Sequence, residues 1–312
     1  MTTAFVKAFI PIEITDVRFI SSTILEPAAG EPIFSIGGTY NEFDQVSVVS
    51  ANSHLLYESL IDTNTGNDPT TPPATPPIPW KLKSYTNRYR MFEYNNGLPS
   101  TGASPLTTVI RPGTRINAIS LLGVRASTAS LTVQDGIGGP VVFSLNQDLL
   151  ARHAMTPYEI AFAPFVYDNV VTAFDVPPVI DPVVTMTLTD SSGTCDIGRF
   201  AVGMAADMGE VDWGSVREDE NYSSITYEAG FAKFDPVPSI PVLELPIEID
   251  TVRVNRARQF KEQANGKAVV WSAMNGIDTL REMHVLIGPY QRFRFSTLNH
   301  RLAKIDLTIK GI

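Results

Sequence analysis

The sequence has a single cysteine, Cys195, among its 312 residues. One cysteine excludes an intramolecular disulfide and a thiolate metal cluster, so stability has to come from packing or from assembly. Charged residues are also few, at 18%, and no apolar run approaches the about 20 residues that span a bilayer. Hydrophobic residues make up 44% of the chain, which is typical of an ordered globular protein.

The sequence also lacks the common nucleotide, metal and hydrolase motifs. Gly136–Pro140 is rich in glycine but ends in proline, and Gly266-Lys267 has no Walker pattern around it. Asp62–Asp68 begins like a calcium loop, but it has no glycine at the sixth position and has Pro73 in place of the bidentate glutamate. No G-x-S-x-G elbow and no histidine pair at metal-binding spacing is present. We therefore expect no cofactor, no metal site, no catalytic residues and no enzymatic activity.

The first residues do not resemble a secretory signal. Met1–Ile14 contains Lys7 and a short apolar stretch, but Pro11 and Glu13 interrupt it. This pattern favours synthesis in a cytoplasm without membrane insertion.

Charge is unevenly distributed along the chain. The net charge is -9, yet residues 251–312 hold 11 Lys/Arg against 4 Asp/Glu, so this segment is +7 and the remainder is -16. Opposite charges on two regions favour an oriented contact with copies of the chain or with neighbouring subunits, although a basic domain that is merely soluble has the same composition. The acidic balance elsewhere opposes nucleic-acid binding.

Strand signals dominate the chain, so we predict a mainly β fold. Short β-branched runs bounded by Gly, Pro, Asn or Asp recur from about residue 105 to 205, which favours a β-sandwich of jelly-roll type. Composition and turn signals divide the chain into an N-terminal strand or arm (1–30), a small module (31–95), the β-sandwich (96–207) and a C-terminal β-rich α+β domain (208–312).

One helix is predicted, within the C-terminal domain. It begins near Asp250-Thr251, runs through about 251–265 with apolar residues at helical spacing, and stops at Asn265-Gly266. The following β-branched runs predict a small sheet that backs this helix. Arg253, Arg256 and Lys261 stand away from its apolar side, so they are candidate assembly residues, or simply the solvated side of an amphipathic helix.

The small module carries an aromatic set that is the best binding candidate: Tyr40, Tyr57, Trp80 and Tyr85. Six prolines from Pro69 to Pro79, just before Trp80, predict a stiff, extended loop. The aromatic rings either stack on sugar or form the core of a unit with little else to bury. We expect Tyr57 to pack inward, and Tyr40 and Trp80 to be the exposed pair.

Within residues 37–80, the succession Gly37–Tyr40, Asp44–Val48, Leu56–Leu60, Asp62–Pro69 and Trp80 resembles the small carbohydrate-binding module of chitinases. With the continuation Thr86–Phe92, the run resembles a family of tailed-bacteriophage virion proteins. This resemblance implies a three-stranded carbohydrate-binding-like module before a β-rich body, and a location in the virion near the distal end of the tail.

Three functional classes follow. The first is a structural component of a phage tail tip, baseplate or adsorption apparatus, with other tail proteins as partners, homo-oligomeric in a symmetric assembly, and contacting host surface glycan. The second is a glycan-binding adhesion or receptor-binding protein. The third is a polysaccharide-degrading enzyme, for which the acidic groups near Asp207–Asp212 and Glu218–Glu220 are candidates.

Overall fold

A computed structural model describes residues 5–51, 53–73, 76–94, 97–151, 156–212, 214–228, 231–273 and 284–312. The protein is mainly β, with 52% strand and 8% helix, which confirms the predicted fold class. Two compact units are present, Ile12–Val202 and a second that combines Met1–Pro11 with Gly203–Ile312. Residues 1–30, which the sequence predicted as one N-terminal segment, thus contribute to both units.

The larger unit contains a β-sandwich of two antiparallel sheets. One sheet has the order β15-β10-β17-β8, and the other has the order β12-β11-β16-β9-β2. Strands β8 to β11 alternate between the two sheets. Without the edge strand β2, each sheet has four strands, and their orders β15-β10-β17-β8 and β12-β11-β16-β9 are those of a jelly roll, as predicted. The strands are β2 (Phe19–Ser22), β8 (Ser100–Ala103), β9 (Leu106–Ile110), β10 (Ala118–Arg125), β11 (Thr128–Asp135), β12 (Val141–Asp148), β15 (Val170–Phe174), β16 (Pro182–Thr189) and β17 (Thr194–Gly203).

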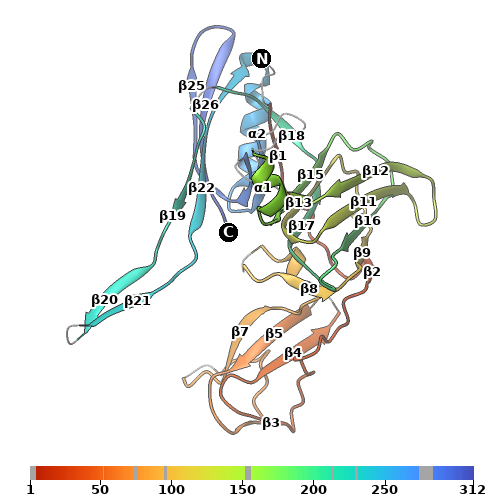
Figure 1. Cartoon of the computed structure of the whole chain (residues 1–312), viewed down its shortest axis with the longest axis vertical. Helices are drawn as coiled ribbons and strands as arrows, with labels where there is room; N and C mark the ends of the chain where they lie inside the picture. Colours follow the sequence, from red (N-terminus) through yellow and green to blue (C-terminus); the bar gives the residue numbers. More distant parts are fainter. Residues whose placement is uncertain are drawn as a thin grey trace. The chain divides into compact units, whose positions relative to one another are not determined.

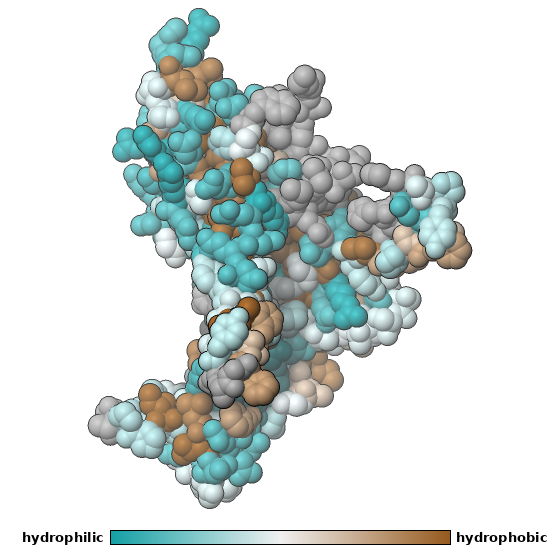
Figure 2. All heavy atoms as spheres, turned by 60° about the vertical axis from the view of Figure 1, so that its left-hand side comes forward, coloured by the Kyte–Doolittle hydropathy of each residue, from teal (hydrophilic) through white to brown (hydrophobic). Residues whose placement is uncertain are grey.

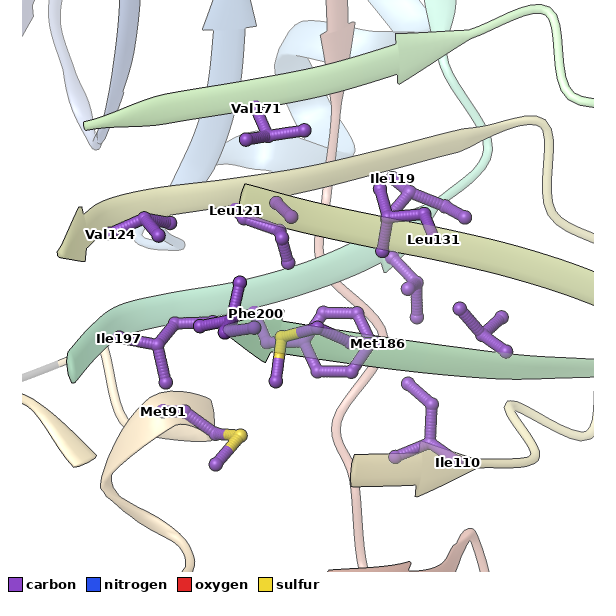
Figure 3. Packing of buried hydrophobic residues seen from close by; sticks show 14 of the residues in the cluster. Met91, Ile110, Ile119, Leu121, Val124, Leu131, Val171, Met186, Ile197 and Phe200 are labelled. Carbon is purple, nitrogen blue, oxygen red and sulfur yellow. The ribbon is translucent and has the colours of Figure 1, made fainter. Parts of the chain in front are cut away.

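Alternating side chains of these strands fill the space between the sheets. Leu121 and Phe200 come from one sheet, and Leu131 and Met186 come from the other, so that both sheets contribute to one buried cluster (Figure 3). Met91 reaches the same cluster from the short helix η1 (Arg90–Phe92). At one edge lie the short pair β13 (Leu150–Ala151) and β14 (Val166–Tyr167), and helix α1 (Pro157–Phe162).

The small module belongs to the same unit and has its own sheet. Strands β4 (Gln45–Ser50), β5 (Ser53–Ser59) and β7 (Trp80–Tyr85) form a three-stranded antiparallel sheet, as the resemblance implied. Two short strands, β3 (Thr39–Tyr40) and β6 (Asn64–Thr65), pair beside it.

The second unit is built on one long sheet with the order β24-β23-β1-β18-β22-β26-β25, and β19 also pairs with β22. Residues from both ends of the chain meet in it, because β1 lies between β18 and β23. The strands are β1 (Phe5–Phe9), β18 (Ala206–Val211), β19 (Val216–Glu220), β22 (Ile240–Asp250), β23 (Val269–Ser272), β24 (Val285–Gly288), β25 (Tyr290–Thr297) and β26 (Leu302–Lys310).

Helix α2 (Val254–Ala264) packs on this sheet and confirms the predicted helix. It is preceded by the 3-10 turn η2 (Thr251–Arg253), and the Asp250 carboxylate caps this turn by accepting from the Val252 N–H. Phe260 on its buried side contacts Trp271 edge to face, with ring centroids 5.9 Å apart. The apolar spacing recognised in the sequence therefore marks the face that the helix buries.

A separate hairpin extends this unit. Strands β20 (Ser224–Glu228) and β21 (Phe231–Asp235) pair only with each other among the described strands. The hairpin continues the β19–β22 ribbon beyond the end at which Glu220 pairs with Ile240 (Figure 1). We call residues Tyr222–Val237 the arm.

Candidate interaction surfaces

Of the two aromatic residues expected to form an exposed sugar platform, Trp80 is buried and Tyr40 is half-buried against it. Trp80 is only 5% exposed, and its indole N–H donates to the Asn67 carbonyl at 2.9 Å. Tyr40 packs edge-on against Trp80 and stacks on Phe34, while its hydroxyl exchanges hydrogen bonds with the Ser35 backbone. The expectation that Trp80 is exposed is wrong, because a module of this size has few other large side chains to bury.

The other two tyrosines share a face of the three-stranded sheet. On β5, Leu55 and Tyr57 project to one side, and they pair across to Tyr85 and Leu82 of β7. Tyr57 and Tyr85 are both half-buried, and this partial burial raises the pKa of each phenol above its ordinary value. Tyr57 thus packs partly inward, as expected, while both rings keep exposed surface.

A cluster of charged side chains lies where the module meets the rest of the larger unit. His54 contacts Glu26 through Nδ1 at 2.9 Å and Asp16 through Nε2 at 2.6 Å, and the Tyr89 ring stacks on its imidazole at a centroid distance of 3.7 Å. The Tyr89 hydroxyl donates to Asp16 at 2.7 Å, and burial raises the pKa of this phenol.

Two arginines complete the cluster. Arg88 lies 3.4 Å from Glu26, and Arg90 donates to Glu31 at 2.5 Å. The second oxygen of Glu31 accepts from the Asn87 N–H. The polar atoms are therefore occupied by one another, and this arrangement holds segments 16–31, 54 and 86–90 together rather than presenting a reactive group.

The predicted assembly residues of α2 have different surroundings. Arg253 contacts Asp207 at 3.2 Å, and the Lys261 ammonium lies 5.7 Å from the centre of the Phe293 ring. Arg256 is exposed, as is its neighbour Arg258. The structure therefore separates the three candidates: two of them make contacts within the unit, and Arg256 faces solvent.

The arm is the surface that the sequence analysis missed. Its strand register places Ile225 opposite Phe234 and Tyr227 opposite Ala232, so these four side chains share one face. Thr226 and Lys233 share the other face. Tyr227 is 77% exposed and Phe234 is 59% exposed. Figure 2 shows hydrophobic side chains gathered on this hairpin, beside its grey tip. The alternation around Ala229-Gly230 is a hairpin signal that could have located it.

The base of the arm is fixed by Lys310 at the end of β26. Its ammonium donates to the Glu220 carboxylate and to the Tyr222 hydroxyl, each at 2.5 Å, and it lies 4.9 Å from the Tyr222 ring centre. The ammonium holds the pKa of Glu220 below its usual value. The arm is thus attached to the sheet by a defined contact, while its apolar face has no cover among the described residues.

No protein-family model, curated protein or solved structure matches this chain. Within the described residues, no group of three or more His, Cys, Asp or Glu side chains is placed to hold a metal ion. None of the described helices is long and apolar enough to cross a bilayer.

Replacing Trp80 with alanine tests whether this ring is core. Because Trp80 is buried against Tyr40 and Phe34, Trp80→Ala should lower the free energy of unfolding by about 3 kcal/mol. Chemical denaturation of the purified chain measures this change. Leu82→Ala, on the same strand but exposed, is the matched control and should have a much smaller effect. Equal effects of the two variants would show that Trp80 is not core.

Removing Glu31 tests the charged cluster. Glu31→Ala leaves the mostly buried Arg90 guanidinium without its carboxylate, so the free energy of unfolding should fall by about 3 kcal/mol. Asp181→Ala, which breaks the exposed pair with Arg111, should change stability far less. If thermal unfolding shows the same loss for both variants, the cluster does not have the structural role described above.

Proposed function

We propose that this protein is a structural component of the tail tip, baseplate or adsorption apparatus of a tailed bacteriophage, where it binds other tail proteins. The observation that carries the proposal is the arm, whose hairpin exposes one apolar face formed by Ile225, Tyr227, Ala232 and Phe234. An isolated two-stranded hairpin is marginally stable in water, and an exposed apolar face of this kind marks a protein contact.

The remainder of the structure supports a scaffold role. The jelly-roll sandwich and the long sheet of the second unit each have an extensive buried core, so they can hold exposed surfaces rigidly. The resemblance of residues 37–92 to tailed-phage virion proteins supplies the phage setting. Under this proposal the protein acts through binding and positioning, and its exposed surfaces are contacts with neighbouring subunits.

Immunogold electron microscopy on particles of the source phage tests the location. Antibody raised against the recombinant chain should concentrate label at the distal tail. Antibody absorbed beforehand with the same chain is the control and should give no label. Absence of specific label from both intact and mildly disrupted particles would reject a virion role.

A second candidate function, glycan binding, is favoured by the shared face of Tyr57 and Tyr85. Two half-buried rings on one sheet face can stack on a sugar without a large loss of side-chain entropy. If the face binds glycan, Tyr57→Ala with Tyr85→Ala should reduce binding of the purified chain to host surface polysaccharide at least tenfold.

Phe43→Ala is the matched control for this measurement. Phe43 is an exposed aromatic residue in a turn of the same module, outside the β5–β7 face. The Phe43→Ala variant should leave polysaccharide binding unchanged, and circular dichroism should show that all variants remain folded. No binding by the unmodified chain, or equal binding by all variants, would reject the glycan role for this face.

A further inference from the structure

We infer that the apolar face of the arm binds a second copy of this chain, at a patch on the opposite end of the same unit. The inference rests on the proposed function for its setting, a repeated assembly, and it names the partner that the arm would bind. Three observations carry it: the pattern of the arm, the composition of the patch and the distance between them.

The arm has the pattern of a strand pair with one face in contact with protein. Ile225, Tyr227 and Phe234 project to one side, whereas Thr226, Lys233 and Asp235 project to the other together with one aromatic residue, Phe231. Such alternation is typical of antiparallel strands that bury one face and leave the other in water. No described residue of the chain covers the apolar side, so this face is open to a partner.

The patch lies where η2 meets the turn between β25 and β26. The Thr251 N–H donates to the Arg301 carbonyl at 2.9 Å, and Leu298 and Leu302 are joined by a backbone hydrogen bond across the turn. Val252 is 85% exposed, and both leucines are also exposed. We call Val252, Arg256, Leu298, Arg301 and Leu302 the end patch. It combines apolar side chains with exposed positive charge.

Charge favours a contact between the arm and the end patch. The arm holds one basic residue against two acidic ones, a net charge of -1. At its base β19 adds Glu218 and Asp219 against Arg217, whereas Glu220 is paired with Lys310. Segments 250–258 and 298–304 together hold five basic residues against one acidic one, a net charge of +4. Within the second set Arg253 contacts Asp207 and Lys304 lies 3.9 Å from Asp212, so Arg256, Arg258 and Arg301 carry the charge that faces outward. Two arms facing each other would instead bring like charges together.

Distance excludes a contact within one molecule. β22 pairs with β19 at its Ile240 end and reaches the end patch at Asp250, opposite Leu302. These 11 residues of strand span about 35 Å. The arm continues away from Ile240, and the β25–β26 turn lies at the other end of the sheet (Figure 1). The arm therefore reaches only the end patch of another copy, in a head-to-tail contact that produces a ring or a filament.

Sedimentation velocity of the full-length chain over a range of concentrations measures this contact. The unmodified protein should associate reversibly, and added salt should weaken the association because the contact pairs opposite charges. Tyr227→Ser with Phe234→Ser should weaken association at least tenfold. Phe231→Ser is the matched control, because Phe231 is 80% exposed but lies on the other face, so it should associate like the unmodified chain.

Mixing two defective variants tests the head-to-tail geometry. Val252→Asp with Arg301→Glu removes the end patch and keeps the arm, whereas Tyr227→Ser with Phe234→Ser removes the arm and keeps the end patch. Each variant alone should be monomeric, and a mixture should form a 1:1 complex through the one intact arm and the one intact patch. An unchanged thermal unfolding midpoint for each variant separates loss of contact from loss of fold.

Three results would overturn the inference: a monomeric unmodified chain at every concentration, association that survives loss of the arm face, or a mixture that forms no complex. This test is independent of the phage setting. Self-association without label on phage particles would reject the proposed function and keep the contact between copies. Label on the tail with a monomeric chain would reject the contact and keep the proposed function.

Discussion

The long antiparallel pairing of β22 is the interaction on which the second unit depends. This strand pairs along nine residues with β26 and along five with β19, and it also contacts β18 beside β1. One continuous ladder therefore joins segments from both ends of the chain. The same strand positions the two surfaces that we connect, because the arm extends beyond one end of it and the end patch lies at the other.

Buried and exposed aromatic residues have opposite roles in this protein. Trp80 and Tyr40 satisfy their polar atoms within the module and pack against each other, so they stabilise a small unit that has little other core. Tyr227 and Phe234 lie on a hairpin with too few residues to bury them. Aromatic side chains occur in both places, so only their surroundings distinguish a ring that packs inside the module from a ring that is exposed for contact with another molecule.

Much of the fold could be predicted from the sequence because it depends on local periodicity. The α2 helix follows from the spacing of Ala257, Phe260 and Ala264 after a capping Asp250, and the jelly roll follows from evenly spaced short strands. Pairing over long separations is not a local property, so the place of β1 between β18 and β23 required the structure.

The candidate sites were less predictable for the same reason. Exposure of Trp80 depends on what Phe34 and the 64–67 segment bring against it, and no sequence window contains that information. The His54 cluster joins Asp16 and Glu26 to residues 86–90, so its members are far apart in sequence. The arm, by contrast, has a local signal in its alternating pattern. That pattern does not indicate whether any other part of the chain covers the apolar face.

Hydrogen–deuterium exchange, measured on the full-length chain at low and at high concentration, tests the central claim most directly. Amides in the arm exchange rapidly when the hairpin stands alone in water, and a docked hairpin is protected. The account predicts that protection appears at high concentration in segments 224–235 and 298–302 together, while the jelly-roll core is unchanged. Exchange in both segments that does not depend on concentration would contradict it.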